Sequence, residues 1–160
     1  MAVKIRLAGL DDLPAMMLIE DACFGDERFD ASVVRSFLAR KDSFALLAVE
    51  KDEVIGAAMC ICSLHSSRGR IASVAVLTPH RGLGIGSKLV AACEDEFRRR
   101  GASKFTLEVA VDNAGAVKTY LDNGYRIKLT IKNYYSRGRS AYYMEKETHM
   151  EGRRRKVRVS

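Results

Sequence analysis

The chain has 160 residues, enough for one domain with a complete hydrophobic core. Hydrophobic residues make up 48% of it and charged residues 29%, which exclude a disordered chain or a coiled coil. No apolar run approaches the roughly 18 residues that a membrane span needs. The N-terminus lacks the apolar segment of a secretory signal, so we expect a cytoplasmic protein without membrane contacts.

The net charge of +7 comes from 27 Lys and Arg against 20 Asp and Glu. Part of the excess lies at the C-terminal end, in Arg153, Arg154, Arg155, Lys156 and Arg158. No aromatic residue is interleaved with these charges, so a platform for stacking single-stranded nucleic acid is not indicated. We expect residues 148–160 to form a basic, flexible tail, with a nucleic-acid or ribosome contact as the alternative.

The cysteines and histidines show no spacing that indicates a disulfide framework or a metal site. The four cysteines have no CxxC pair, and a core of this size needs no disulfide, so we expect reduced thiols. The three histidines are scattered, so we expect no metal. These residues are Cys23, Cys60, Cys62, Cys93, His65, His80 and His149.

The first third of the chain predicts a strand, two helices and a hairpin. Residues 4–7 alternate as in a strand, and Asp11 and Asp12 precede a Pro-containing helix start whose helix ends near residue 25. Asp30 or Ser32 caps a second helix. Two apolar runs, residues 44–49 and 54–62, follow as a hairpin. The expected inner faces of the two helices are Leu13, Met16, Met17 and Ile19, then Val33, Val34, Phe37 and Leu38.

The rest of the chain alternates between strands and helices. Residues 71–77 predict a strand, and helical spacing then runs from Leu89 to Phe97 until Gly101 ends it. The remaining segments predict strand 105–111, helix 114–122, and closing strands 125–131 and 141–146. The order β-α-α-β-β-β-α-β-α-β-β indicates one α/β domain with a mixed sheet, which we place at residues 1–147.

Three alternating glycines mark the junction between the strand and the helix at residues 81–87. Gly82, Gly84 and Gly86 remove side chains that would keep a ligand from the backbone. A helix that begins there presents unpaired N–H groups and the positive end of its dipole. We therefore expect an anion to bind at this junction, with a merely flexible turn as the alternative.

The spacing of the glycines and of Ser87 and Lys88 tests two known anion-binding motifs. A dinucleotide fingerprint, Gly-x-Gly-x-x-Gly, would need its third glycine where Ser87 stands. A phosphate-binding Walker loop needs Lys before Ser or Thr, whereas Ser87 precedes Lys88. Neither nucleotide motif fits this loop.

The run Arg81-Gly82-Leu83-Gly84-Ile85-Gly86 resembles the acyl-CoA pyrophosphate loop of the GNAT acetyltransferase superfamily, Arg/Gln-x-x-Gly-x-Gly/Ala. Within it the chain is most similar to the protein N-terminal acetyltransferases, the RimI-like enzymes and the Ard or Naa catalytic subunits. The resemblance covers roughly residues 3–147 and implies the GNAT-type mixed sheet in a single domain. The further matches, in chain order, are Leu107-Glu108-Val109, Asn113, Ala116, Tyr120, Gly124-Tyr125, Asn133-Tyr134-Tyr135 and Tyr142-Tyr143-Met144.

This resemblance implies acetyl-CoA as cosubstrate, held between two splayed strands, and protein or peptide N-termini as acceptors, such as ribosomal proteins or nascent chains. The implied cofactor-binding residues are Val74, Ala75 and Val76 for the pantetheine and thioester, Arg81, Gly82, Leu83, Gly84, Ile85, Gly86 and Ser87 for the pyrophosphate, and Asn113 and Tyr120 farther along. The turn after the first helix keeps only the aromatic residues of the RimI-like substrate loop. The expected substrate-binding residues are Phe24, Glu27, Phe29, Tyr134 and Tyr135.

The chemistry needs two proton carriers. An α-amino group has a pKa of about 7.7–8.0, against about 10.4 for lysine, so a modest base suffices. The family spacing suggests Glu108 as the base, directly or through a water, and Tyr120 as the acid that protonates the departing thiolate. A backbone N–H near Val76 would stabilise the oxyanion.

Three alternatives stay open. A small-amine acetyltransferase would use the same loop, although the paired tyrosines argue against it. A non-catalytic CoA-binding or ribosome-associated module would use the basic tail. An acyl-enzyme route through a thiolate is disfavoured, because Cys60, Cys62 and Cys93 are expected in the core.

Overall fold

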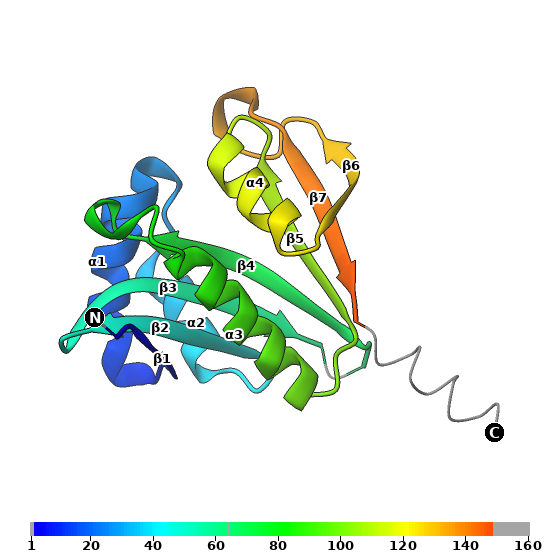
Figure 1. The fold of residues 1–160 in the computed structure, drawn as a ribbon. Helices are drawn as coiled ribbons and strands as arrows, with labels where there is room; N and C mark the ends of the chain where they lie inside the picture. The colour runs from blue at the N-terminus through cyan, green and yellow to red at the C-terminus, as the bar shows by residue number, and fades with distance from the viewer. Residues whose placement is uncertain (1, 64, 149–160) are drawn as a thin grey trace, which may run out of the picture.

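The structure is a computed structural model that describes residues 2–63 and 65–148. These residues form one seven-stranded sheet in the order β1-β2-β3-β4-β5-β7-β6, with neighbours antiparallel except the parallel pair β4 and β5 (Figure 1). The predicted order of elements and the mixed sheet are confirmed. The strands are β1 (Lys4–Leu7), β2 (Ser43–Glu50), β3 (Glu53–Cys62), β4 (Arg68–Val76), β5 (Lys104–Ala110), β6 (Arg126–Ile131) and β7 (Ala141–Glu147), and the helices are α1 (Leu13–Phe24), α2 (Ala31–Ala39), α3 (Ile85–Arg99) and α4 (Ala114–Asp122).

Helices cover both faces of the sheet, α1 and α2 on one side and α3 and α4 on the other (Figure 1). Alternate residues of β2 therefore enter different cores: Phe44 and Leu46 pack with α3, and Ala45 and Leu47 pack with α1 and α2. A strand buried on both faces has no polar side to alternate with. This explains why β2 and β3 read as continuous apolar runs.

Three local predictions need correction. Asp30 lies at the N-cap of α2, but its side chain makes no capping hydrogen bond. Asp12 lies at the N-cap of α1, but its carboxylate does not cap the helix; it accepts from Arg6 at 3.0 and 2.9 Å and from the Gly9 N–H at 2.8 Å. Val33 on α2 is 38% exposed, and the buried face of that helix consists of Val34 and Phe37. Asp12 pairs with Arg6 instead of capping the helix, because strand β1 places the Arg6 guanidinium next to the helix start.

Strands β4 and β5 pair over only four residues and then separate. Their register runs from Arg68 opposite Lys104 to Ile71 opposite Leu107. Beyond it, β4 stays paired with β3 and β5 stays paired with β7. The β3–β4 register shifts so that Ala72 is an extra residue in β4, and a bulge of this kind bends a strand. The resulting gap, between residues 72–76 and 108–110, is called the strand opening below (Figure 1).

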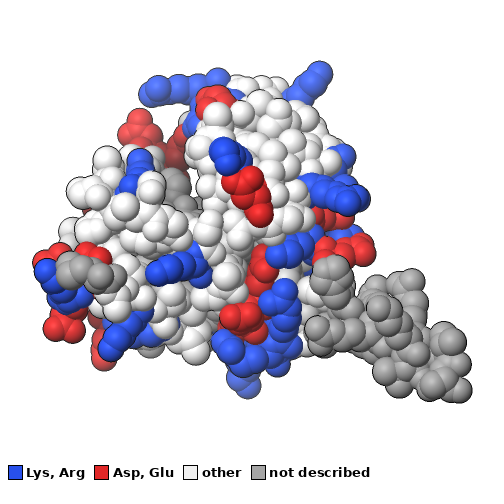
Figure 2. Space-filling model, in the orientation of Figure 1, with Lys and Arg blue, Asp and Glu red and all other residues white. Residues whose placement is uncertain are grey.

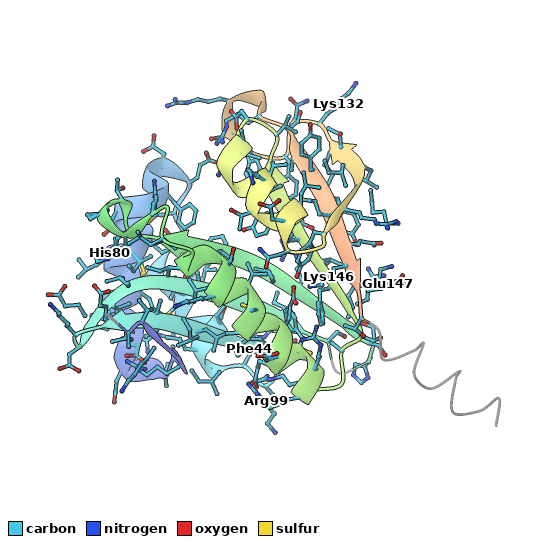
Figure 3. The ribbon with its side chains drawn as sticks, in the orientation of Figure 1. Phe44, His80, Arg99, Lys132, Lys146 and Glu147 are labelled. Carbon is cyan, nitrogen blue, oxygen red and sulfur yellow. The ribbon has the colours of Figure 1, made fainter. Side chains whose placement is uncertain are left out.

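Polar side chains reinforce the closed end of this opening. The buried Glu94 of α3 accepts from the Tyr125 hydroxyl at 2.8 Å and from Lys146 Nζ at 2.9 Å. Lys146 lies on β7, opposite Phe105 in the paired part of β5 (Figure 3). Helix α3 is thereby tied to the second half of the sheet next to the point where β4 and β5 still pair.

Charges on the surface are mixed. Lys and Arg are interspersed with Asp and Glu on the face that Figure 2 presents. At the end of α3, for example, Glu96 accepts from Arg99 at 2.7 Å and from Arg100 at 2.9 Å. The predicted basic tail, apart from Thr148, lies outside the described residues. Within the described ranges, no helix is long and apolar enough to cross a membrane.

Candidate active site

Two cavities, each of about 550 Å³, meet at the strand opening. One is lined by Glu108, Arg70 and the paired tyrosines and is called the Glu108 cavity. The other is lined by β4 and the glycine loop, residues 81–87, and is called the glycine-loop cavity. The residues that line both are Cys23, Phe24, Val74, Asn113, Ala116 and Tyr120. A group held in one cavity can therefore reach a group held in the other.

The glycine loop leaves the start of α3 open. Gly82 and Gly84 have φ values of +78° and +81°, in the left-handed region that favours glycine, and Gly84 is the N-cap of α3. Gly86 lines the cavity, and a Cβ built on it would meet no atom of the described chain within 4 Å. No described side chain caps the helix, so its first N–H groups stay available to a ligand. This geometry suits an anion.

The flanking residues of the loop have distinct contacts. Arg81 lines the cavity and donates from Nε to the Val76 carbonyl at 2.8 Å. Ser87 accepts from Asn123 at 3.1 Å, which links α3 to the end of α4. Leu83 was expected to hold pyrophosphate, but its side chain is 68% exposed and does not line the cavity, so only its backbone is available for that role. Ile85 is buried, with its side chain in the core below the loop.

The β4 edge of the opening carries Val74, Ala75 and Val76, and all three line the glycine-loop cavity. Val74 and Val76 pack against the α3 side of the sheet, while Ala75 belongs to the α1 side. The Val76 carbonyl already accepts from Arg81 and, at 3.7 Å, from the Cys23 thiol. Cys23 is thus a thiol donor at the junction of the two cavities.

Asn113 caps α4 and lines both cavities. Its Oδ1 accepts from the Ala116 N–H at 3.2 Å, which gives it a structural role that the sequence did not indicate. Gly115 lines the glycine-loop cavity in the next turn, and a Cβ built on it would meet no described atom within 4 Å. The start of α4 therefore approaches the ligand space without side-chain bulk at Gly115.

Tyr120 is buried at the junction and lines both cavities. Its ring meets Tyr125 edge to face, with centroids 6.1 Å apart. Burial raises the pKa of Tyr120 far above its usual value, so the hydroxyl keeps its proton at neutral pH. The hydroxyl therefore carries a proton that it can donate in a hydrogen bond at the junction.

Glu108 lies on β5, directly after the last residue that pairs with β4. Its side chain is 13% exposed and contacts Arg70, whose Nε and Nη2 lie 3.0 and 2.9 Å from Oε1. Arg70 Nη2 also lies 3.4 Å from the Tyr134 hydroxyl. The sequence did not reveal Arg70, because the strand that carries it begins three residues earlier than predicted.

Arg139 connects the loops above the Glu108 cavity. It contacts Glu27 in the turn after α1, and it binds Asp112 after β5 at 3.2 and 3.0 Å. Its guanidinium also lies 5.5 Å from the centre of the Tyr135 ring. Glu27 was expected to bind substrate, but its carboxylate is already engaged by Arg139.

The aromatic residues expected to bind substrate do line the Glu108 cavity. They are Phe24, Phe29, Tyr134 and Tyr135. The two tyrosine rings meet edge to face at 4.9 Å, and Phe29 stacks on Phe37 of α2 at 6.1 Å. Aromatic rings therefore line part of the cavity that contains the Arg70–Glu108 ion pair, beside charged side chains such as Glu20, Glu27 and Arg139.

Glu20 of α1 also lines this cavity and was missed by the sequence analysis. It is only 3% exposed, and Oε1 accepts from the Phe29 N–H at 2.7 Å. Burial raises its pKa, against the lowering effect of that hydrogen bond. The sequence could have indicated that Glu20 is buried, because it follows Met16 by four residues and so lies on the buried stripe of the helix.

Three of the four cysteines lie in the core, whereas Cys23 lines both cavities. The four cysteines are free, and Cys60, Cys62 and Cys93 are buried as expected. Among residues 2–63 and 65–148, no three His, Cys, Asp or Glu side chains are gathered as they would be around a metal ion.

A model of the acetyltransferase (GNAT) family matches residues 13–125. The chain is similar to N-alpha-acetyltransferase 30 of Schizosaccharomyces pombe, with 34% identity over 119 residues that cover 72% of this chain and 79% of the relative. It is also similar to N-alpha-acetyltransferase MAK3 of Arabidopsis thaliana, with 30% identity over 140 residues that cover 86% and 73% of the two chains.

The fold is also similar to that of a protein of known structure. Arabidopsis thaliana Naa50 in complex with the bisubstrate analogue CoA-Ac-MVNAL superimposes with a TM-score of 0.81 at 27% identity, over 92% of this chain and 100% of that chain. The family match extends over well more than half of the sequence and includes the glycine loop, Glu108 and Tyr120. The chain therefore belongs to the GNAT family of acetyltransferases.

Proposed function

We propose that this protein transfers the acetyl group of acetyl-CoA to the N-terminal α-amino group of proteins, by direct attack in a ternary complex. The observation that carries the proposal is the meeting of two cavities at Tyr120, one with an anion-binding helix start and one with a carboxylate. The similarity to N-alpha-acetyltransferases over most of the chain supports this class of acceptor. Nascent chains and ribosomal proteins are acceptors of this class.

The residues of the glycine-loop cavity fit acetyl-CoA, which supplies the acetyl group as a thioester. The open helix start and Arg81 would hold the pyrophosphate, with Gly82, Leu83, Gly84, Ile85, Gly86 and Ser87 contributing backbone. The unpaired β4 edge at Val74, Ala75 and Val76 would accept the amide-containing pantetheine arm as a sheet accepts a strand. Asn113 would bind the arm through the amide nitrogen that capping leaves free.

The residues around the junction supply the proton transfers. Glu108 would take the proton of the amine, directly or through a water. A backbone N–H near Val76 would stabilise the negative charge on the carbonyl oxygen. Tyr120 would protonate the departing thiolate, consistent with a hydroxyl that burial keeps protonated.

The loops that line the Glu108 cavity would determine which acceptors bind. The Arg139 contacts with Glu27 and Asp112 hold two loops of this cavity together, and Tyr134 and Tyr135 line it. We expect the acceptor to enter as an extended chain with a terminal amine. Phe24 and Phe29 would contact the first side chain of that acceptor.

The test is an acceptor panel with the full chain and acetyl-CoA. It contains peptides with free N-termini of varied sequence, N-blocked peptides with an internal lysine, polyamines and aminoglycosides. Thiol release gives the rate, and mass spectrometry locates the acetyl group. We expect α-amino acetylation of a subset of free-N-terminus peptides. Preferred turnover of a small amine, or CoA binding without thiol release from any amine, would contradict the proposal.

A further inference from the structure

Arg70 and Glu108 meet at the closed end of the strand opening. Arg70 is opposite Thr106, in the paired part of β4 and β5, and Glu108 is the first β5 residue beyond the pairing. The Arg70 side chain therefore crosses from one strand to the other where they part. The same guanidinium touches the Tyr134 hydroxyl of the loop between β6 and β7, so one side chain connects three elements around the carboxylate.

The contacts treat the two carboxylate oxygens differently. Nε and Nη2 of Arg70 lie 3.0 and 2.9 Å from Oε1 of Glu108. Within the described residues, no side chain or backbone N–H donates to Oε2. A carboxylate fixed through one oxygen keeps the lone pairs of the other for a proton. Arg70 can thus fix the orientation of Glu108 without blocking its basic oxygen.

Arg70 is the positively charged side chain in contact with the Glu108 carboxylate. Tyr143 of β7 lies opposite Glu108 in register, and Tyr134 and Tyr135 face it from the loop. The acidic groups of the same cavity are Glu20 and Glu27, and Arg139 engages Glu27. Burial lowers the pKa of Arg70, but the hydrogen bond and charge of Glu108 more than offset this, so Arg70 stays charged. The Arg70 side chain is 39% exposed, which leaves the pair partly screened.

We propose that Arg70 is a positioning residue: it holds Oε1 of Glu108 and leaves Oε2 for the amine proton. This inference rests on the proposed role of Glu108 as base. Arg70 lines the Glu108 cavity and not the glycine-loop cavity, so acetyl-CoA binding does not depend on it.

The experiment compares kcat and KM of peptide acetylation for the wild type, Arg70→Gln, Arg70→Lys, Glu108→Gln and a matched control, Arg68→Met. Arg68 lies on the same strand two residues earlier and lines a separate surface pocket. For Arg70→Gln we expect kcat to fall roughly tenfold, because the base is no longer held in place, while KM for the peptide stays near the wild-type value. Arg70→Lys keeps a donor for Oε1 but loses the two-nitrogen contact, so we expect kcat to fall by a smaller factor. The CoA Kd of each variant should match the wild type by calorimetry.

Each outcome decides something different. If Glu108→Gln keeps wild-type turnover at neutral pH, the assigned base is wrong and the proposed mechanism fails. If Glu108→Gln is slow but Arg70→Gln keeps the wild-type kcat, or Arg68→Met lowers kcat equally, the role of Arg70 is overturned. Should Arg70→Gln not fold, judged by CoA binding and melting, Arg70→Lys decides: wild-type kcat in that variant overturns the positioning role.

Discussion

Tyr120 and Glu108 reach the junction from different elements and have different surroundings. Tyr120 comes from α4 and is buried among apolar side chains, whereas Glu108 comes from β5 and has an arginine beside it. Burial keeps the Tyr120 hydroxyl protonated, whereas the contact with Arg70 fixes the orientation of the Glu108 carboxylate. The two side chains thus bring a hydroxyl and an oriented carboxylate oxygen to the junction.

The two roles can be separated by the leaving group. Glu108→Gln should slow peptide acetylation by about 10² to 10⁴ and be partly rescued in alkali, where the amine loses its own proton. Tyr120→Phe keeps the packed ring and removes only the hydroxyl. An acyl donor with a more acidic thiol should therefore restore the Tyr120 variant far more than the Glu108 variant. Wild-type turnover in both variants at neutral pH would mean that the pair is structural.

Glu20 gives a prediction on stability. Its folded-state pKa lies above the unfolded value of 4.5, so ionisation of this carboxylate opposes folding as the pH rises through the folded pKa. Glu20→Gln keeps an oxygen acceptor for the Phe29 N–H and removes the charge. We expect equal melting temperatures of variant and wild type near pH 4 and an increasing advantage for the variant toward pH 8. The exposed Glu53→Gln serves as control, and a pH-independent difference for Glu20→Gln would refute this account.

Single residues were predictable where a motif fixed them. Glu108, Tyr120 and the glycines lie in runs that a family pattern identifies, and the structure places them around the junction. Arg70 and Arg139 act through partners 38 and 112 residues away, at Glu108 and Glu27. Such pairs depend on which strands and loops become neighbours, which the order of residues alone does not state.

At the level of elements, a substitution in the glycine loop can weaken ligand binding without disturbing the packing of the fold. Gly86 lies in the first turn of α3 without a positive φ, so alanine suits its backbone and should leave the melting temperature equal or slightly higher. The added methyl group would enter the glycine-loop cavity. We expect CoA affinity to fall by roughly tenfold, about 1.4 kcal/mol, by calorimetry. Gly9→Ala, also into open space but outside both cavities, is the control; unchanged affinity in Gly86→Ala would remove the loop from the binding site.

The elements themselves were largely predictable, because their periodicity follows from burial. The two-sided burial of β2 and β3 leaves apolar runs, and the one-sided burial of α3 leaves a helical stripe. The bulge at Ala72 was not predictable, since no glycine or proline marks it. It is a tertiary feature, and it decides where β4 leaves β5.

For the whole molecule, we propose that the domain ends with β7. Thr148 still donates its N–H to the Ser103 carbonyl at 3.0 Å, which extends the expected boundary of residue 147 by one residue. Truncation after Thr148 should leave the acetylation of short peptides unchanged, because no proposed site residue lies beyond it. The comparison is kcat/KM on one peptide for both chains. A large loss in the truncated chain would assign the tail to the site, whereas a loss only on ribosome-bound chains would assign it to docking.

The strand opening has a consequence for solubility. Exposed strand edges promote association between chains, and proteins usually cover or shorten them. Here two such edges, residues 72–76 and 108–110, face each other inside one sheet. Bound acetyl-CoA would cover the β4 edge, so its depletion should leave a strand-sized slot open to any extended segment, including one from another copy. The supply of acetyl-CoA would then govern how readily the protein self-associates in concentrated solution, as well as how fast it works.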